Sequence, residues 1–190
     1  MTVMFKENKE NAMKAGFTGY ITETGAYEFT IKAAFWKTST NGNKYLEING
    51  ETLNGESINF LNIYYQNANV ETLQFGTRLI HALMGLVGVK QLTTERLYDQ
   101  QVAPELTGKT VGVFVQKRYL TKADGTETSS LNVLDFYDPQ TLQTFKERET
   151  GANATRIEFL LKTVKDAPAQ PIKSVPAPTQ EKPFNDRIPF

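Results

Sequence analysis

Residues 25–38 read GAYEFTIKAAFWKT, and their side chains alternate in character along the stretch. The mainly apolar face comprises Tyr27, Phe29, Ile31, Ala33 and Phe35. The opposite face comprises Glu28, Thr30, Lys32, Ala34 and Trp36. A period of two residues predicts a strand whose apolar face lies on the core. We therefore expect Trp36, the single tryptophan, to lie on the outward face beside Lys32.

Two further strands follow this one closely. STNGN (39–43) contains an Asn-Gly pair, which is a strong signal for a tight hairpin turn. KYLEINGETL (44–53) then predicts a second strand, and NGE (54–56) turns the chain into SINFLNIYYQ (57–66). The sequence thus predicts a three-stranded antiparallel meander.

A helix and a second hairpin follow the meander. NVETLQFGTRLIHALMGLVG (69–88) has apolar residues at helical spacing, with Asn69 as the expected cap and Gly88 as the expected stop. LTGKTVGVFVQKRYLT (106–121) predicts a long strand, and TSSLNVLDFYD (128–138) pairs with it across an Asp-Gly turn.

The end of the body is less uniform. DPQTLQTFKERETG (138–151) predicts a short helix capped by Asp138, with Pro139 at its first position and Gly151 after its end. The period of ATRIEFLLKTV (154–164) fits a strand slightly better than a helix, and both remain open.

Five strands with a helix between the third and the fourth are typical of the OB fold, a Greek-key barrel. We expect a mainly β, five-stranded OB-fold barrel with an additional C-terminal helix and a disordered C-terminal tail. OB folds bind single-stranded nucleic acids or oligosaccharides around their second and third strands.

The outward positions of the meander carry aromatic side chains. If Leu46, Ile48, Leu61 and Ile63 point inward, the alternate positions of strands two and three point outward. Those positions are Tyr45, Glu47, Asn49, Ile58, Phe60, Asn62 and Tyr64. With Trp36, the residues Tyr45, Phe60 and Tyr64 predict an exposed platform on which bases stack, each for about 1–3 kcal/mol. Aromatic residues also favour strands for packing reasons alone.

Basic side chains are predicted near the same platform, around the two hairpin loops. They are Lys32, Lys37, Lys44, Lys117, Arg118 and Lys122, with Tyr119 beside them. In an OB fold these loops flank the groove, so the cations would meet phosphates and Tyr119 would stack on a base. The alternative is that hairpin turns carry lysine because they are solvated.

The sequence divides the chain into four parts: an arm (1–15), a body (16–165) that we expect to be an OB-fold DNA-binding domain, a flexible proline-rich linker (166–182) and an apolar tip (183–190) that we expect to bind other proteins. Lys+Arg and Asp+Glu both number 21, so net charge favours no class of partner. The most apolar stretch, LIHALMGLVGV (79–89), is too short to span a bilayer. We expect a soluble cytoplasmic protein.

The residue types needed for catalysis are scarce. The chain has no cysteine, and its one histidine, His81, lies in the predicted apolar helix. Asp135 and Asp138 suggest a pair of Mg²⁺ ligands, but Asp138 is better explained as a helix cap. We therefore expect a protein that is not an enzyme and has no metal or other cofactor.

These strands, from GAYEFTIKAAFWKTSTNGNKYLEI through LTGKTVGVFVQKRY, resemble bacteriophage-encoded single-stranded-DNA-binding proteins of OB fold. The residues PFNDRIPF (183–190) resemble the tip of bacterial single-stranded-DNA-binding proteins, which closes on Asp-Asp-Ile-Pro-Phe, although Arg187 stands where an acid is usual. The resemblance implies binding of single-stranded DNA during phage replication or recombination in the host cytoplasm. It also implies that replication or recombination proteins bind the tip through Asp186, Ile188, Pro189 and Phe190.

Two alternatives stay open at this point, as does homo-oligomerisation. The first is a phage assembly or adaptor protein whose barrel binds only protein, with the aromatic face buried in an interface. The second is a nuclease that uses Asp135 with other carboxylates.

Overall fold

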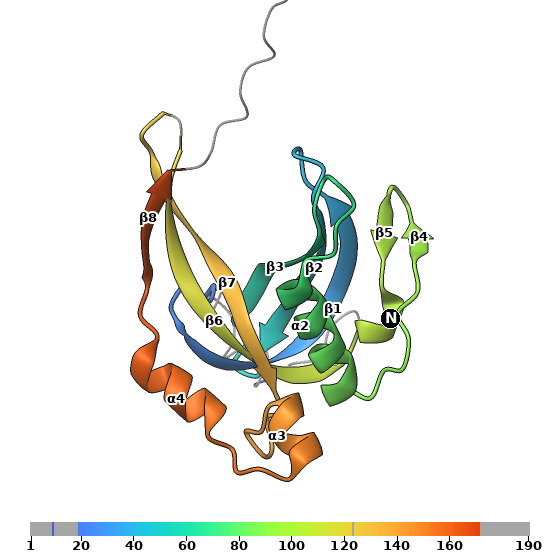
Figure 1. Cartoon of the computed structure of the whole chain (residues 1–190), viewed down its shortest axis with the longest axis vertical. Helices are drawn as coiled ribbons and strands as arrows, with labels where there is room; N and C mark the ends of the chain where they lie inside the picture. The colour runs from blue at the N-terminus through green and yellow to red at the C-terminus, as the bar shows by residue number, and fades with distance from the viewer. Residues whose placement is uncertain (1–8, 10–18, 123, 172–190) are drawn as a thin grey trace, which may run out of the picture.

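The computed structural model describes residue 9, residues 19–122 and residues 124–171 (Figure 1). Within them the meander forms as predicted: β1 (Gly25–Thr38), β2 (Lys44–Thr52) and β3 (Ser57–Gln66) pair antiparallel in sequence order. The Asn-Gly turn closes the first hairpin, where Gly42 has a φ of 79°. The remainder of the arm (1–15), residues 172–182 of the linker and the tip (183–190) lie outside the described residues.

After β3 the chain forms a helix, a small hairpin, a 3₁₀ turn and a long hairpin: α2 (Gln74–Leu86), β4 (Glu95–Leu97), β5 (Gln100–Val102), η1 (Pro104–Leu106), β6 (Thr110–Thr121) and β7 (Glu127–Tyr137). The predicted helix starts later than expected, because Asn69 lies in a turn and Leu73 precedes the first helical residue without a side-chain cap. Gly88, with a φ of 71°, follows the helix end as predicted. The β4–β5 hairpin was not predicted.

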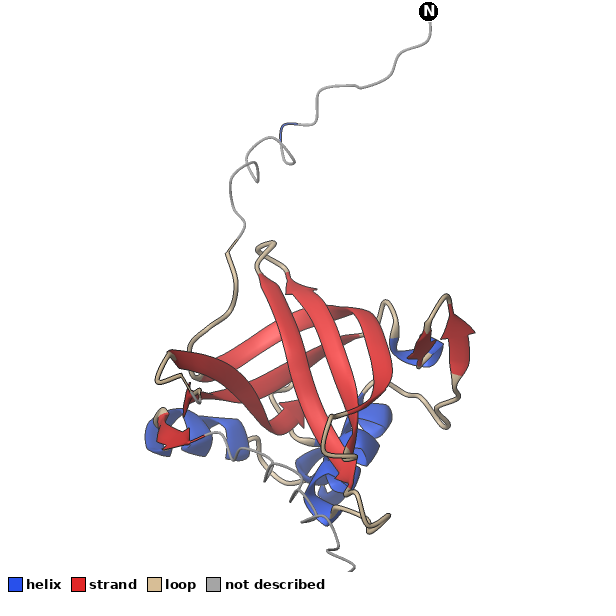
Figure 2. Cartoon of the chain, turned by 90° about the horizontal axis from the view of Figure 1, so that it is seen from above, coloured by secondary structure: helices blue, strands red, loops and turns tan. Residues whose placement is uncertain are grey.

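Strand β1 organises the sheet. One edge of β1 pairs with β2, and the other edge pairs first with β6 and then with β5. Figure 2 shows the strongly curved sheet that results, with the β4–β5 hairpin projecting from its edge. The inner face of the sheet and the buried side of α2 enclose the main core, whose largest fully buried side chains include Phe29, Phe136, Ile31, Leu46, Ile48 and Leu83.

Glycine lets α2 approach the sheet closely. A Cβ atom at Gly76 would lie 1.8 Å from the carbonyl oxygen of Tyr64 in β3, so no larger residue fits there without a shift. This close approach packs the first turns of α2 against the end of β3. The end of β3 also forms one wall of a pocket.

The C-terminal elements differ from the predictions. Asp138 does not cap a helix; its side chain accepts hydrogen bonds from the backbone N–H groups of Gln140 and Thr141 in a turn. The helix α3 (Phe145–Thr150) begins only after Thr144, which forms a capping box with Glu147. The first residues of the predicted linker form the strand β8 (Ala167–Pro171), which pairs parallel with β6.

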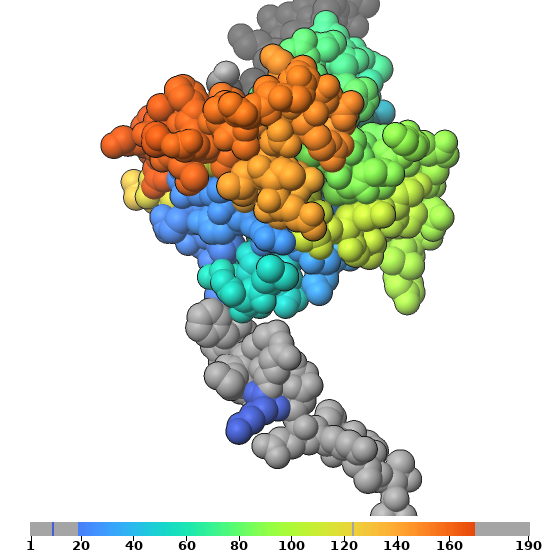
Figure 3. Space-filling model, turned by 90° about the horizontal axis from the view of Figure 1, so that it is seen from below, coloured from blue at the N-terminus to red at the C-terminus, as the bar shows by residue number. Residues whose placement is uncertain are grey.

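Residues 156–163 form the helix α4 (Arg156–Thr163), where the period slightly favoured a strand. Ile157 and Leu160, three residues apart, pack on Phe114 and Tyr137 of the β6–β7 hairpin. Phe159 and Leu161 lie on the exposed side, which explains why the apolar pattern alternates along this helix. Together, α3 and α4 occupy the end of the molecule opposite the long hairpin tips (Figures 1 and 3).

The fold is therefore a mainly antiparallel β-sheet with few helices. Strands β3 and β7 lie beside each other, but within the described residues no hydrogen-bonded ladder joins them. The expected closed barrel is thus not found. No helix in the described part of the chain is long and apolar enough to cross a membrane.

Candidate nucleic-acid interface

The outward face of β2 and β3 carries a pair of tyrosines. Tyr45 and Tyr64 are register partners, and their ring centroids lie 4.9 Å apart with the rings tilted by 36°. Tyr64 is 40% exposed, and Tyr45 is half-buried beside it. Burial raises the pKa of the Tyr64 hydroxyl, with a smaller contribution from Tyr45. The two predicted stacking residues are therefore brought together on one surface.

Phe60 lies on the same face and is 66% exposed. Its backbone is in the left-handed region, with a φ of 59°, and its N–H donates a hydrogen bond of 2.7 Å to Oδ1 of Asn49. A bulge at this point shifts the pairing of β2 and β3, so that Ile58 is fully buried. The prediction that Ile58 points outward is wrong, because the extra residue reverses the alternation before Phe60.

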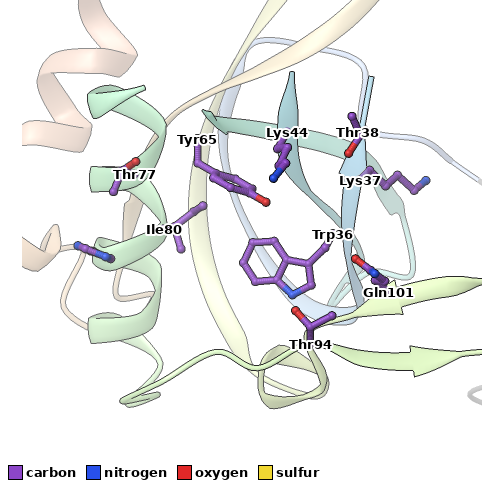
Figure 4. Close-up of a pocket in the computed structure, with 10 residues that line it drawn as sticks. Trp36, Lys37, Thr38, Lys44, Tyr65, Thr77, Ile80, Thr94 and Gln101 are labelled. Atoms are coloured by element: carbon purple, nitrogen blue, oxygen red, sulfur yellow. The ribbon is translucent and has the colours of Figure 1, made fainter. Parts of the chain in front are cut away.

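Trp36 does not lie on this face. A bulge between Ile31 and Ala33 in β1 inverts the alternation of all later residues. Trp36 therefore packs against the core side (Figure 4). Its ring meets the ring of Tyr65 edge-on, with the ring centroids 5.5 Å apart. Its Nε1–H donates a hydrogen bond to the carbonyl of Thr93. Phe35 lies on the outward face instead of Trp36. The ammonium of Lys37 lies over the Phe35 ring and also contacts Glu47 of β2 on that face.

We call the set Phe35, Tyr45, Phe60 and Tyr64 the aromatic face. Its central acid, Glu47, is 5% exposed and accepts a hydrogen bond of 2.7 Å from Nζ of Lys37. Lys32 pairs with Glu51 at 3.5 Å farther along β1 and β2. Two of the predicted phosphate-binding lysines thus already have carboxylate partners.

Cations of the second hairpin are also partly paired. Nζ of Lys117 lies 2.9 Å from Glu23, a contact that raises the pKa of Lys117 and lowers that of Glu23. The hydroxyl of Tyr119 donates to Asp166 at 3.2 Å, and the Lys117 ammonium lies over the Tyr119 ring. Arg118 is half-buried where β6 meets β8, so this side chain is not presented to the surface as expected.

Two predicted cations remain exposed without an ion-pair partner among the described residues, namely Lys44 and Lys122. Lys44 begins β2 and Lys122 follows β6, so each stands at the tip of one long hairpin. Both tips lie at the upper end of the molecule in Figure 1. Among the predicted phosphate-binding cations, the exposed ones without an ion-pair partner in the described residues therefore lie at these two tips.

Sequence reasoning missed one further aromatic residue near this face. Tyr20, which is 66% exposed, forms an isolated bridge with Ser57 before β1 begins. With Phe60, Asn62 and Leu131 it lines a cleft of about 250 Å³ between β3 and β7. Tyr20 lies outside every alternating stretch, so no periodic signal marked it.

The acid of the nuclease alternative has a structural contact. Oδ2 of Asp135 lies 3.3 Å from Nε of Arg156, which joins β7 to the start of α4. Burial raises the pKa of Asp135 and outweighs the opposing effect of Arg156. Within the described residues, no group of three or more His, Asp or Glu side chains is arranged to hold a metal ion.

The comparisons with known proteins give a family without an assigned function. No curated protein matches the chain. The model of the family described as "Protein of unknown function (DUF669)" matches residues 7–141, which include β1 to β7 and α2 and end before α3. Because that match spans well over half of the chain, the protein belongs to the DUF669 family.

Proposed function

We propose that the protein binds single-stranded DNA, with little sequence preference, on the aromatic face. Successive bases would stack on Tyr45, Phe60 and Tyr64. Phe35 would lie beneath the edge of the bound DNA. Every base has a π-face, so stacking on such a surface tolerates any sequence. The lysines at the hairpin tips would neutralise phosphates.

The observation that carries the proposal is the exposure of Phe60 in a strained conformation. A non-glycine residue in the left-handed region costs about 1–2 kcal/mol. Phe60 incurs this cost and still leaves most of its ring in water. Phe60 is thus a strained, exposed aromatic residue next to the Tyr45–Tyr64 pair, and such strain clusters at binding sites.

The arrangement of strands supports an OB-type fold. Strand β1 is shared between the meander and the β6–β7 hairpin, and α2 lies between the third and fourth long strands. The first and last long hairpins point to the same end (Figure 1). In OB folds the ligand crosses the second and third strands between these two loops, which is where the aromatic face lies.

Charge would make a moderate contribution to affinity. Lys44 and Lys122 are exposed, whereas Lys32 and Lys37 would have to exchange Glu51 and Glu47 for phosphate. We expect affinity to fall with salt, with a slope of roughly −0.7 per phosphate neutralised. Stacking would therefore supply much of the binding free energy.

The resemblance to phage single-stranded-DNA-binding proteins suggests a cellular role. The protein would protect single strands during phage replication or recombination in the host cytoplasm. Asp186, Ile188, Pro189 and Phe190 of the tip would recruit replication or recombination proteins. The role needs no catalytic step and no cofactor.

The test is fluorescence anisotropy of end-labelled oligo(dT) titrated with the full chain, at low and at high salt. A labelled duplex of the same length is the control. We expect salt-sensitive binding of the single strand and much weaker binding of the duplex. No binding of oligo(dT) at low salt would refute the proposal and leave the aromatic face as a protein-binding surface, as in the adaptor alternative.

A further inference from the structure

A pocket of about 420 Å³ lies on the other side of β1 and β2 from the aromatic face. It opens between the C-terminal half of β1, the helix α2 and the β4–β5 hairpin (Figure 4). Its volume is within the range of about 300–1,000 Å³ usual for small-molecule sites. The bulge in β1 creates this pocket, because it turns Trp36 away from the outward face.

Aromatic rings form two of its walls. Trp36 and Tyr65 meet at an interplanar angle of 87°, and Ile80 of α2 closes the apolar side. The indole is held in place by its hydrogen bond of 3.0 Å to the carbonyl of Thr93. Thr93 is fixed in turn, since its N–H donates to Oε1 of Glu105 at 3.0 Å. The walls are therefore fixed in position before any ligand arrives.

The rim of the pocket is polar. The remaining lining side chains are Lys37, Lys44, Thr38, Thr77, His81, Thr94 and Gln101, so no carboxylate of the described residues lines the pocket. Lys44 has no ion-pair partner among the described residues, and Figure 4 shows its ammonium directed toward the rings. An aromatic interior with a basic rim suits a planar ring that carries an anionic group.

We propose that this pocket binds one nucleotide of the bound single strand, with its base against Trp36 and Tyr65 and its phosphate at Lys44. This inference rests on the proposed function, because the nucleotide is part of the strand held on the aromatic face. Lys37 contacts Glu47 on that face and also lines the pocket, so the DNA has a short path around the end of the β1–β2 hairpin, beyond the pairing of β1 with β5. One base then leaves the stack and enters the pocket.

The experiment follows two signals in one titration with labelled oligo(dT). Anisotropy of the label reports binding anywhere on the protein. Fluorescence excited at wavelengths that tyrosine does not absorb reports the pocket, because Trp36 is the only tryptophan. We expect both signals to change together, and we expect saturating oligo(dT) to shield Trp36 from quenching by acrylamide.

Three variants locate the effect. Tyr65→Leu should weaken affinity roughly five- to a hundredfold and reduce the acrylamide protection. Lys44→Gln, a change at an exposed residue, should lower the salt slope by about 0.7 without disturbing the fold. Tyr64→Leu, one residue from Tyr65 but on the aromatic face, should weaken affinity while leaving full protection of Trp36 at saturation.

The outcomes separate the two proposals. If anisotropy shows binding while Trp36 stays unprotected, and Tyr65→Leu binds as the wild type does, the pocket inference is wrong and the proposed function stands. If anisotropy shows no binding, the proposed function fails and the pocket inference fails with it.

Discussion

Tyr45 and Tyr64 stand opposite each other on β2 and β3, with ring centroids 4.9 Å apart. The pair forms because its members share a register position and an outward direction, and Phe60 extends the surface along β3. Since none of the three rings is fully buried, they offer π-faces to a ligand without unfolding any part of the sheet.

The aromatic face should account for much of the affinity. Tyr64→Leu and Tyr45→Leu should each weaken binding of oligo(dT) by about 1–3 kcal/mol, because each removes one stacking ring. Anisotropy titrations at constant salt measure the change. Tyr98→Leu is the matched control, since Tyr98 is 89% exposed on the β4–β5 hairpin, away from the face. Equal affinities for all three variants and the wild type would exclude this face as the site.

Phe60 should strengthen DNA binding while it lowers the stability of the fold. In Phe60→Asn the left-handed backbone is retained at lower cost, because asparagine tolerates that region better than phenylalanine does. We expect the free energy of unfolding to stay equal or to rise, by up to about 1 kcal/mol, while affinity for oligo(dT) falls. Urea denaturation and anisotropy measure the two effects. A variant that is clearly less stable but binds normally would mean that the Phe60 ring serves the fold.

The charge at the second hairpin tip should appear in the salt dependence. Lys122→Gln should reduce the slope of log affinity against log salt by about 0.7, because one phosphate contact is lost. Lys146→Gln, at an exposed lysine on α3 at the other end of the molecule, should leave the slope unchanged. A similar loss in both variants would indicate a nonspecific effect of net charge rather than a contact at the tip.

Glu147 should make the junction of α3 and α4 sensitive to acid. Burial alone would raise its pKa, but hydrogen bonds from the backbone N–H groups of Thr144, Thr155 and Arg156, and from the Thr144 hydroxyl, lower it from 4.5 to about 2. Because the folded-state pKa is the lower one, the stabilisation is complete above about pH 4.5 and is lost as the pH falls toward 2.

Glu147→Gln should therefore lower the free energy of unfolding at neutral pH by about 1–3 kcal/mol, since buried N–H groups lose a charged acceptor. The variant should also lose part of the fall in stability between pH 4.5 and 2. Urea denaturation across this range measures both effects. Glu149→Gln is the control at an exposed neighbour, and a wild-type acid response in Glu147→Gln would contradict the assignment.

The strands could be predicted because turn signals fix their ends. Asn41-Gly42 and Asp124-Gly125 lie at the two long hairpins, and β1 to β3 fall within one residue of their predicted bounds. The side chains facing outward could not all be predicted. The bulge in β1 falls beside Ala33 and Ala34, two small residues that give no contrast in polarity between the two faces. Strict alternation of side chains therefore assigned Trp36 to the wrong face.

Other differences arise from tertiary contacts. Residues 156–163 become a helix because Ile157 and Leu160 find an apolar surface on the β6–β7 hairpin, which their own sequence does not specify. Strands β4 and β5 are three residues each and largely exposed, so they show no apolar alternation. The carboxylate partners of the lysines, Glu23, Glu47 and Glu51, lie on other segments that only the tertiary structure brings beside them.

Photo-crosslinking tests the central claim most directly. Oligo(dT) substituted with 5-iodouracil would be irradiated with the full chain, and the crosslinked peptides would be identified by mass spectrometry. The account predicts crosslinks in β2 and β3, at Tyr45, Phe60 or Tyr64. Crosslinks confined to α3, α4 or the β4–β5 hairpin would place the DNA on another surface and contradict it.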